Sequence, residues 1–112
     1  LADASQLEQA LINIIKNALE AVSQSKHKEI TINLYQQTNQ NSVQQLLLDV
    51  EDTGPGIATH VIEQIFVPFF TTKKQGSGIG LSLSRQIMIQ HGGDLKYVTK
   101  AECGACFRLV FG

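Results

Sequence analysis

The sequence lacks the features that mark several large classes of protein. Its charge is balanced, with nine Lys and Arg against ten Asp and Glu, and no basic run alternates with aromatic residues. A nucleic-acid partner therefore has no support. No apolar run approaches the roughly 18 to 20 residues that cross a bilayer, and the first residues lack the pattern of a signal peptide. We expect a soluble domain without direct membrane contact.

Cysteine and histidine are too few and too scattered to indicate a metal centre. Cys103 and Cys106 form one C-x-x-C pair, whereas a structural zinc site needs four ligands and a thioredoxin-like pair begins a helix. This pair enters an apolar strand, which favours two reduced cysteines. The sequence also lacks G-x-x-x-x-G-K-[ST], G-x-S-x-G and H-E-x-x-H, so P-loop, hydrolase and zincin interpretations have no support.

Helical periodicity occurs at two places in the chain. Apolar residues recur at helical spacing over 5–22, and a second long helix should run from about Gly78 or Ile79 to His91. Between them, Thr59 should cap a short helix that continues to about Phe66.

Four segments of the chain have the character of strands. The expected strands are 29–35, 45–52, 94–99 and 104–111. The first two should form an antiparallel hairpin, with Ile30, Ile32 and Leu34 of the first facing inward. Helices on one face of a largely antiparallel sheet make an α+β two-layer sandwich, and 112 residues suit one such domain.

Polar residues suited to chemistry occur first on the long helix and after the second strand. Asn13 and Asn17 lie one turn apart at the edge of the apolar face, where paired amide oxygens suit a hydrated Mg²⁺. An ordinary polar helix face is the alternative to a metal site for these two asparagines.

Asp52 ends a buried strand and is followed by Gly54 and Gly56. An adenine amine would satisfy such a carboxylate and the glycines would admit a flat base, although an Asx turn would satisfy the carboxylate without a ligand.

The segment FFTTKKQGSG has the composition of a mobile loop, and the aromatic residues of FVPFFTTKK can anchor it to the core, as a lid requires. Lys73 or Lys74 at its tip could reach a terminal phosphate, although most such lysines are merely solvated. Gly76, Gly78 and Gly80 then open the second long helix. Unpaired N–H groups and positive potential at a helix start favour a phosphate, whereas simple loop formation is the alternative for these glycines.

Four segments in fixed order resemble the N, G1, F and G2 boxes of the catalytic and ATP-binding domain (HATPase_c) of bacterial sensor histidine kinases. They are QLEQALINIIKNALEAV, DTGPGI, FVPFFTTK and GSGIGLSLSRQIMIQHGG. The resemblance covers about Gln6 to Phe111, and KNALEA with PFFTTK looks most like nitrogen-regulation and dicarboxylate sensors. It implies the Bergerat (GHKL) fold, a mixed, mostly antiparallel sheet with helices on one face.

The resemblance implies ATP and Mg²⁺ as cofactors. Asn17 would hold the Mg²⁺, Asn13 would lie beside the phosphates, Lys73 would contact the terminal phosphate and Asp52 would bind the adenine amine. The other residues implied to bind the nucleotide are Gly54, Gly56, Ile57, Phe66, Thr72, Gly76, Gly78, Ile79, Gly80 and Leu81. Related ATPases have a water-activating glutamate where this chain has Asn13, and an amide cannot act as a base, so we expect little hydrolysis.

The implied function is transfer of the γ-phosphoryl group to a histidine on a separate dimerisation domain, with a response regulator reached through the full-length kinase. The resemblance places the domain in the cytoplasm, as part of a membrane-anchored sensor. The family's acceptor histidine is usually followed by an acidic residue, and none of His27, His60 and His91 is, so this chain should not autophosphorylate. The alternatives are a related serine kinase or ATPase of the same fold and a nucleotide-free interaction module.

Overall fold

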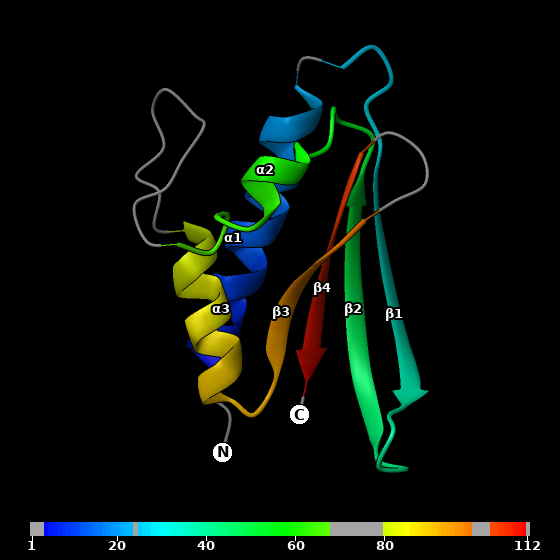
Figure 1. Ribbon diagram of the computed structural model, residues 1–112, viewed down its shortest axis with the longest axis vertical. Coiled ribbons are helices and arrows are strands. Elements are labelled where there is room, and N and C mark those ends of the chain that lie inside the picture. The colour runs from blue at the N-terminus through cyan, green and yellow to red at the C-terminus, as the bar shows by residue number, and fades with distance from the viewer. Residues whose placement is uncertain (1–3, 24, 68–79, 100–103, 112) are drawn as a thin grey trace.

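The computed structural model places helices on one face of a four-stranded sheet (Figure 1). It describes residues 4–23, 25–67, 80–99 and 104–111. The helices are α1 (Ala4–Val22), α2 (Thr59–Ile62) and α3 (Gly80–Gln90), and the strands are β1 (Ile30–Thr38), β2 (Gln44–Asp52), β3 (Asp94–Val98) and β4 (Ala105–Phe111). The expected α+β two-layer sandwich is confirmed. Within the described ranges, no helix combines the length and apolar character needed to cross a membrane.

Helix α1 presents one stripe of small and branched side chains to the interior. Its buried residues recur every four positions and are Ala10, Ile14, Ala18 and Val22. Such positions share one face because an α-helix completes a turn in 3.6 residues. The helix predicted over 5–22 is therefore confirmed, and Asn13 and Asn17 lie partly buried beside the stripe.

Helix α3 packs beside α1 and ends in a glycine cap (Figure 1). Gly92 has a positive φ of 82°, and the N–H of Gly93 donates to the carbonyl oxygen of Met88 at 2.8 Å. A Cβ on Gly93 would lie 1.8 Å from the carbonyl oxygen of Val110 on β4. The predicted stop at Gly92 and Gly93 is confirmed, and the close approach of β4 excludes any side chain at position 93.

Helix α2 differs from the sequence prediction. It is a single turn that ends at Ile62, and Ala58 rather than Thr59 occupies the N-cap position, without a side-chain hydrogen bond. The next residues continue as turns, in which Gln64 N–H donates to the Val61 carbonyl at 2.8 Å. These tighter turns place Ile65 in the core, so the prediction of a longer helix capped by Thr59 was wrong.

The sheet has the strand order β1-β2-β4-β3, and all its neighbouring strands run antiparallel. The parallel pair expected of a mixed sheet does not occur among the strands that the structure describes. Helix α1 packs on β2, and α3 packs on β3 and β4. The core between these layers is centred on Val50, Leu95, Phe107 and Leu109.

Strand β1 lies at the edge of the sheet, beyond the helices (Figure 1). Ile32 and Leu34 pair with Val50 and Leu48 and so share the helix-facing side, yet they are 51% and 58% exposed. Their alternation was predicted correctly and their burial was not. Periodicity identifies the face of a strand, whereas the cover over that face depends on where the helices lie.

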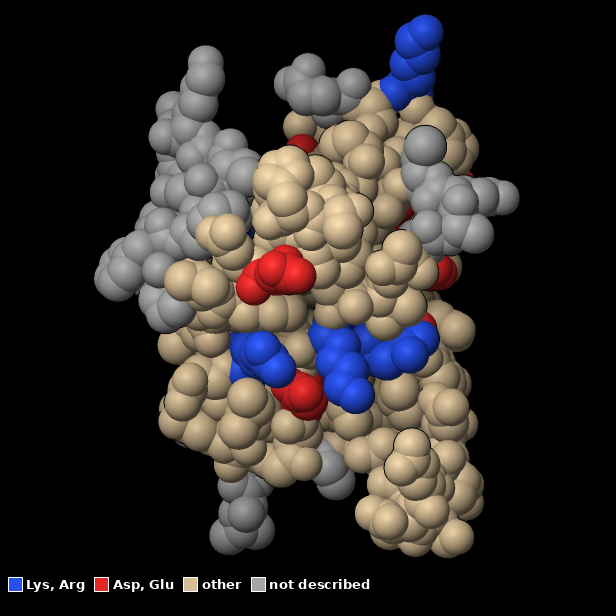
Figure 2. Space-filling view, in the orientation of Figure 1, with Lys and Arg blue, Asp and Glu red and all other residues tan. Residues whose placement is uncertain are grey.

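The opposite face of the sheet is held by a polar cluster that crosses three strands. Arg108 of β4 donates from Nε and Nη2 to the two carboxylate oxygens of Asp49 on β2, at 2.9 and 3.1 Å. The Tyr35 hydroxyl of β1 donates to the same carboxylate at 3.0 Å. These bonds to Asp49 raise the pKa of Arg108, and burial followed by Asp49 raises the pKa of Tyr35. Figure 2 shows basic and acidic side chains next to one another across the middle of the molecule.

Replacing Arg108 should weaken the sheet. Among the described residues, Arg108→Met leaves Asp49, which is 8% exposed, with only the Tyr35 hydroxyl as a side-chain donor, so we expect the free energy of unfolding to fall by about 2 kcal/mol. Urea denaturation measures this change. Lys96 stands opposite Arg108 in the register of β3 and is exposed, so Lys96→Met is the matched control. Equal losses in the two variants would contradict a specific role for the cluster.

Candidate functional site

Asp52 is a carboxylate held almost out of water at the end of β2. It is 2% exposed, and its Oδ1 accepts hydrogen bonds from the N–H groups of Gly54 at 2.8 Å and Ala105 at 3.3 Å. The bond to Gly54 is the local turn considered as an alternative to ligand binding. Both bonds end on the same oxygen, and no donor among the described residues reaches Oδ2. The turn therefore leaves one carboxylate oxygen able to accept from a bound donor.

The two glycines after Asp52 are required by close packing. A Cβ on Gly54 would lie 2.7 Å from the carbonyl oxygen of Ala21, near the C-terminal end of α1. Gly56 has a φ of +78°, and its Cβ would lie 2.8 Å from the carbonyl oxygen of Gly104. The turn is thus pressed between α1 and the start of β4, which keeps the Asp52 carboxylate at the rim of the core.

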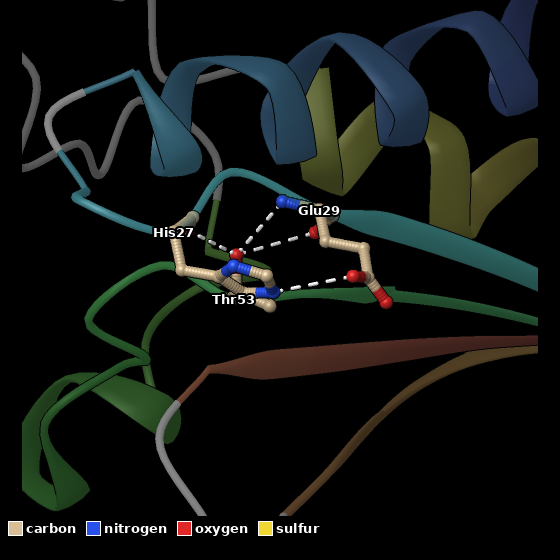
Figure 3. A network of polar contacts seen from close by, with 3 residues as sticks. All are labelled: His27, Glu29 and Thr53. Atoms are coloured by element: carbon tan, nitrogen blue, oxygen red, sulfur yellow. Dashed lines mark hydrogen bonds and ion pairs between the residues drawn. The ribbon is translucent and has the colours of Figure 1, made fainter.

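Thr53 ties this turn to the entry of β1 (Figure 3). Its hydroxyl donates to the carbonyl oxygen of His27 at 2.6 Å and accepts from the N–H of Glu29 at 2.9 Å. Its own N–H donates to the Glu29 carbonyl at 3.2 Å, and His27 Nε2 lies 3.2 Å from the Glu29 carboxylate. Thr53 is therefore held to residues 27–29, at the entry of β1, by hydrogen bonds of both its backbone and its side chain.

Apolar and aromatic side chains among the predicted site residues pack against the core. Three of them are partly buried there, namely Ile57, Phe66 and Leu81. The Phe66 ring meets Phe107 edge-on at 6.5 Å between centroids, and the Arg85 guanidinium lies 5.0 Å from its centroid. Phe66 is thereby fixed in orientation by contacts on two sides.

Tyr97 belongs to this rim and was not predicted from the sequence. Its ring lies 5.4 Å from that of Phe107. Burial raises the pKa of the Tyr97 phenol, a hydrogen bond with the Ile57 backbone lowers it, and the Asp52 carboxylate raises it. Tyr97 thus lies close to two predicted site residues. The sequence did contain a signal for it. Tyr97 stands two positions after the buried Leu95 on β3, so the two side chains share the helix-facing side of the sheet.

Asn13 connects α1 to the first turn of α3. Its Nδ2 donates to Ser84 Oγ at 3.3 Å, and Ser84 Oγ donates to the carbonyl oxygen of Gly80 at 2.8 Å. Asn17 lies one turn further along α1, on the same partly buried flank. The next turn carries Ala21, which contacts the Gly54 turn. The asparagine pair therefore lies between the start of α3 and the Asp52 turn, and the eight helical steps from residue 13 to residue 21 span about 12 Å.

No described atom crowds the first residue of α3. Gly80 begins the helix, and a Cβ there would meet no described atom within 4 Å. The remaining predicted site residues lie outside the described residues and stay predictions. They are Thr72, Lys73, Gly76, Gly78 and Ile79.

A shallow groove of about 460 Å³ lies away from these residues. Its lining includes the amide side chains of Gln37, Asn39 and Gln45, together with Lys96 and Arg108. These side chains belong to the turn between β1 and β2 and to the sheet face opposite the helices. The groove shares no residue with the predicted site, so its volume does not mark that site.

Comparison with known proteins identifies similar sequences and folds. The family model of histidine kinase-, DNA gyrase B-, and HSP90-like ATPases (HATPase_c) matches residues 2–112. Sensor protein FixL of Bradyrhizobium diazoefficiens is 42% identical over 111 residues, which are 98% of this chain and 21% of FixL. The C4-dicarboxylate transport sensor protein DctB of Rhizobium meliloti is 38% identical over 96 residues, or 86% of this chain and 15% of DctB. The chain thus spans about a fifth or less of these relatives.

Two solved structures are similar to this chain in fold. The catalytic domain of histidine kinase ThkA, in a nucleotide-free form, superposes with a TM-score of 0.80 at 36% identity, over 98% of this chain and 68% of that one. Full-length ShkA in complex with AMPPNP superposes with a TM-score of 0.73 at 26% identity, over 99% of this chain and 22% of ShkA.

The packing of the glycines predicts opposite effects at two positions. Gly54→Ala should lower the free energy of unfolding by about 1 to 3 kcal/mol, because its Cβ would collide with the Ala21 carbonyl. Gly80→Ala should leave stability unchanged or slightly raised, since its Cβ enters open space at a helical position. Urea denaturation of both variants tests the difference, and a similar loss at both positions would contradict it.

Proposed function

This chain belongs to the family of histidine kinase-, DNA gyrase B-, and HSP90-like ATPases, and from this premise we propose that it binds Mg²⁺-ATP and donates the γ-phosphoryl group to a histidine of another domain. FixL and DctB, which it resembles over most of its length, are sensor proteins, and ThkA and ShkA are named as a histidine kinase and an AMPPNP complex. The observation that carries the proposal is the nearly buried carboxylate of Asp52 with one oxygen left to accept.

Adenine occupies the rim around Asp52 in this proposal. Oδ2 of Asp52 accepts a hydrogen bond from the exocyclic amine, and a charged acceptor in a partly dehydrated place makes such a bond strong. Gly54 and Gly56 let the base lie close to the backbone. Ile57 and Phe66 provide apolar contact for its faces, and their burial against the core supports this assignment.

The phosphates extend from this rim towards α3. The N–H groups at Gly80 and Leu81, where α3 begins, attract negative charge, and the open space at Gly80 admits it. Asn17 supplies an amide oxygen to Mg²⁺, which keeps several waters and binds the phosphates as well. Asn13 lies beside them. Thr72, Lys73, Gly76, Gly78 and Ile79 complete the site from the connecting segment, with Lys73 at the terminal phosphate.

The proposed chemistry is phosphoryl transfer and not hydrolysis. Asn13 has no basic group to activate water, so catalysis rests on positioning and on stabilisation of the transferring charge. We propose a histidine of a separate dimerisation domain as the acceptor, a response regulator as the later partner of the full-length kinase, and a cytoplasmic place for this domain. His27, His60 and His91 have no assigned role in transfer.

Calorimetric titration with ADP and a non-hydrolysable ATP analogue, with Mg²⁺ and then with EDTA, tests the binding. We expect both nucleotides to bind and Mg²⁺ to assist, and a nucleotide at 100 times its dissociation constant to stabilise the fold by about 2.7 kcal/mol. No binding by the folded chain would contradict the proposal and favour a nucleotide-free interaction module. Transfer is then tested by adding the dimerisation domain of the same protein and radiolabelled ATP.

Asp52→Asn should lower the affinity for ADP by about tenfold to a hundredfold, because a charged acceptor of the adenine amine is lost. The asparagine retains an oxygen for the bonds from Gly54 and Ala105, so the fold should survive. Glu8→Gln, at an exposed position near the start of α1, is the control and should keep the affinity of the unmodified chain. An unchanged dissociation constant for ADP in the Asp52 variant would contradict the adenine assignment.

Asn17→Ala should remove the dependence of nucleotide binding on Mg²⁺, because the only proposed protein ligand of the ion is lost. Titrations of the variant with Mg²⁺ and with EDTA should give the same dissociation constant. Asn33→Ala, at an exposed position on β1, should keep the difference seen in the unmodified chain. A persistent effect of Mg²⁺ in the Asn17 variant would show that the ion is held elsewhere.

A further inference from the structure

Ser84 is a polar residue in the middle of an apolar interface. It is 0% exposed and lies one turn after the start of α3, on the side that faces α1. A buried hydroxyl is costly unless it is hydrogen-bonded, and this one is bonded twice. It accepts from Asn13 Nδ2 and donates to the carbonyl oxygen of Gly80.

These bonds form a directed series that joins two helices. Gln9 Nε2 donates to Asn13 Oδ1 at 3.1 Å, Asn13 Nδ2 donates to Ser84 Oγ at 3.3 Å, and Ser84 donates to Gly80 at 2.8 Å. Because the Ser84 hydrogen is committed to Gly80, its oxygen can only accept from Asn13. The series therefore determines which way the Asn13 amide points.

We propose that Ser84 is a positioning residue for the phosphate half of the nucleotide site. It orients the Asn13 side chain and links it to the first turn of α3. The distance between α1 and the start of α3 in the phosphate region is thereby kept constant. This inference rests on the proposed function, since it concerns the same site. A serine kept only for its small size would make a different prediction, because alanine would then serve equally well at position 84.

The test compares Ser84→Ala with the unmodified chain, using ADP and adenosine as probes. ADP affinity should fall about five- to tenfold, the usual effect of one lost hydrogen bond, while adenosine affinity, measured by NMR titration, should not change. The Asn13 side-chain amide signal should also shift in the NMR spectrum of the nucleotide-free variant. Loss of stability alone would change neither the ratio of the two affinities nor that signal.

Ser23→Ala is the matched control. The Ser23 hydroxyl donates to the Glu20 carbonyl at 2.7 Å, a bond of the same kind as that from Ser84 to Gly80, but at the exposed end of α1. Its ratio of affinities should equal that of the unmodified chain. If Ser84→Ala does not fold, Ser84→Cys keeps the size with a weaker donor and acceptor, and the same ratio is measured there, with a loss of ADP affinity again expected.

The outcomes separate this inference from the proposed function. If the unmodified chain does not bind ADP, the proposed function itself fails. If the unmodified chain binds ADP and the Ser84 variant has the same ratio of ADP to adenosine affinity, the positioning role is wrong. A selective loss for ADP, together with the shifted Asn13 signal, supports it.

Discussion

The arrangement of this domain depends on one carboxylate that is held at the rim of the core. Oδ1 of Asp52 accepts from the turn that follows β2 and from the first residue of β4, so a single oxygen joins two strands and a loop. A carboxylate with so little exposure is stable only with such donors. The same bonds force the turn against α1, where Gly54 is the only residue that fits. No described residue donates to the other carboxylate oxygen, which is therefore suited to recognising a base.

Helix α1 extends the proposed site from the Asp52 turn to the start of α3. Its apolar stripe packs on the sheet, while its flank carries Asn13 and Asn17 and its last turn contacts Gly54. Asn13 lies about 12 Å along the helix from Ala21. The antiparallel helix α3 contributes its first turn at the far end, through Ser84. In the proposed site, one helix therefore sets the separation between the base and the phosphate region.

Much of this could be predicted from the sequence, because periodicity reports which face of an element is apolar. The long helix, the hairpin and the glycine stop after α3 were predicted on that basis. The exposure of Ile32 and Leu34 could not be, since it depends on where the helices lie over the sheet. The early end of α2 depends on burying Ile65, which is a tertiary effect. Ser84 was missed because its partner lies 71 residues away, although a serine four positions before the buried Met88 was a visible signal.

The most direct test of the account is an NMR titration of the chain with Mg²⁺-ADP, followed at the backbone amides and at the asparagine side chains. We expect the largest shifts at Asn13, Asn17, Asp52 to Ile57, and Gly80 with Leu81, all on the side of the helices. Shifts confined to the groove of Gln37, Asn39 and Lys96 on the opposite face, or no shifts at all, would contradict this expectation.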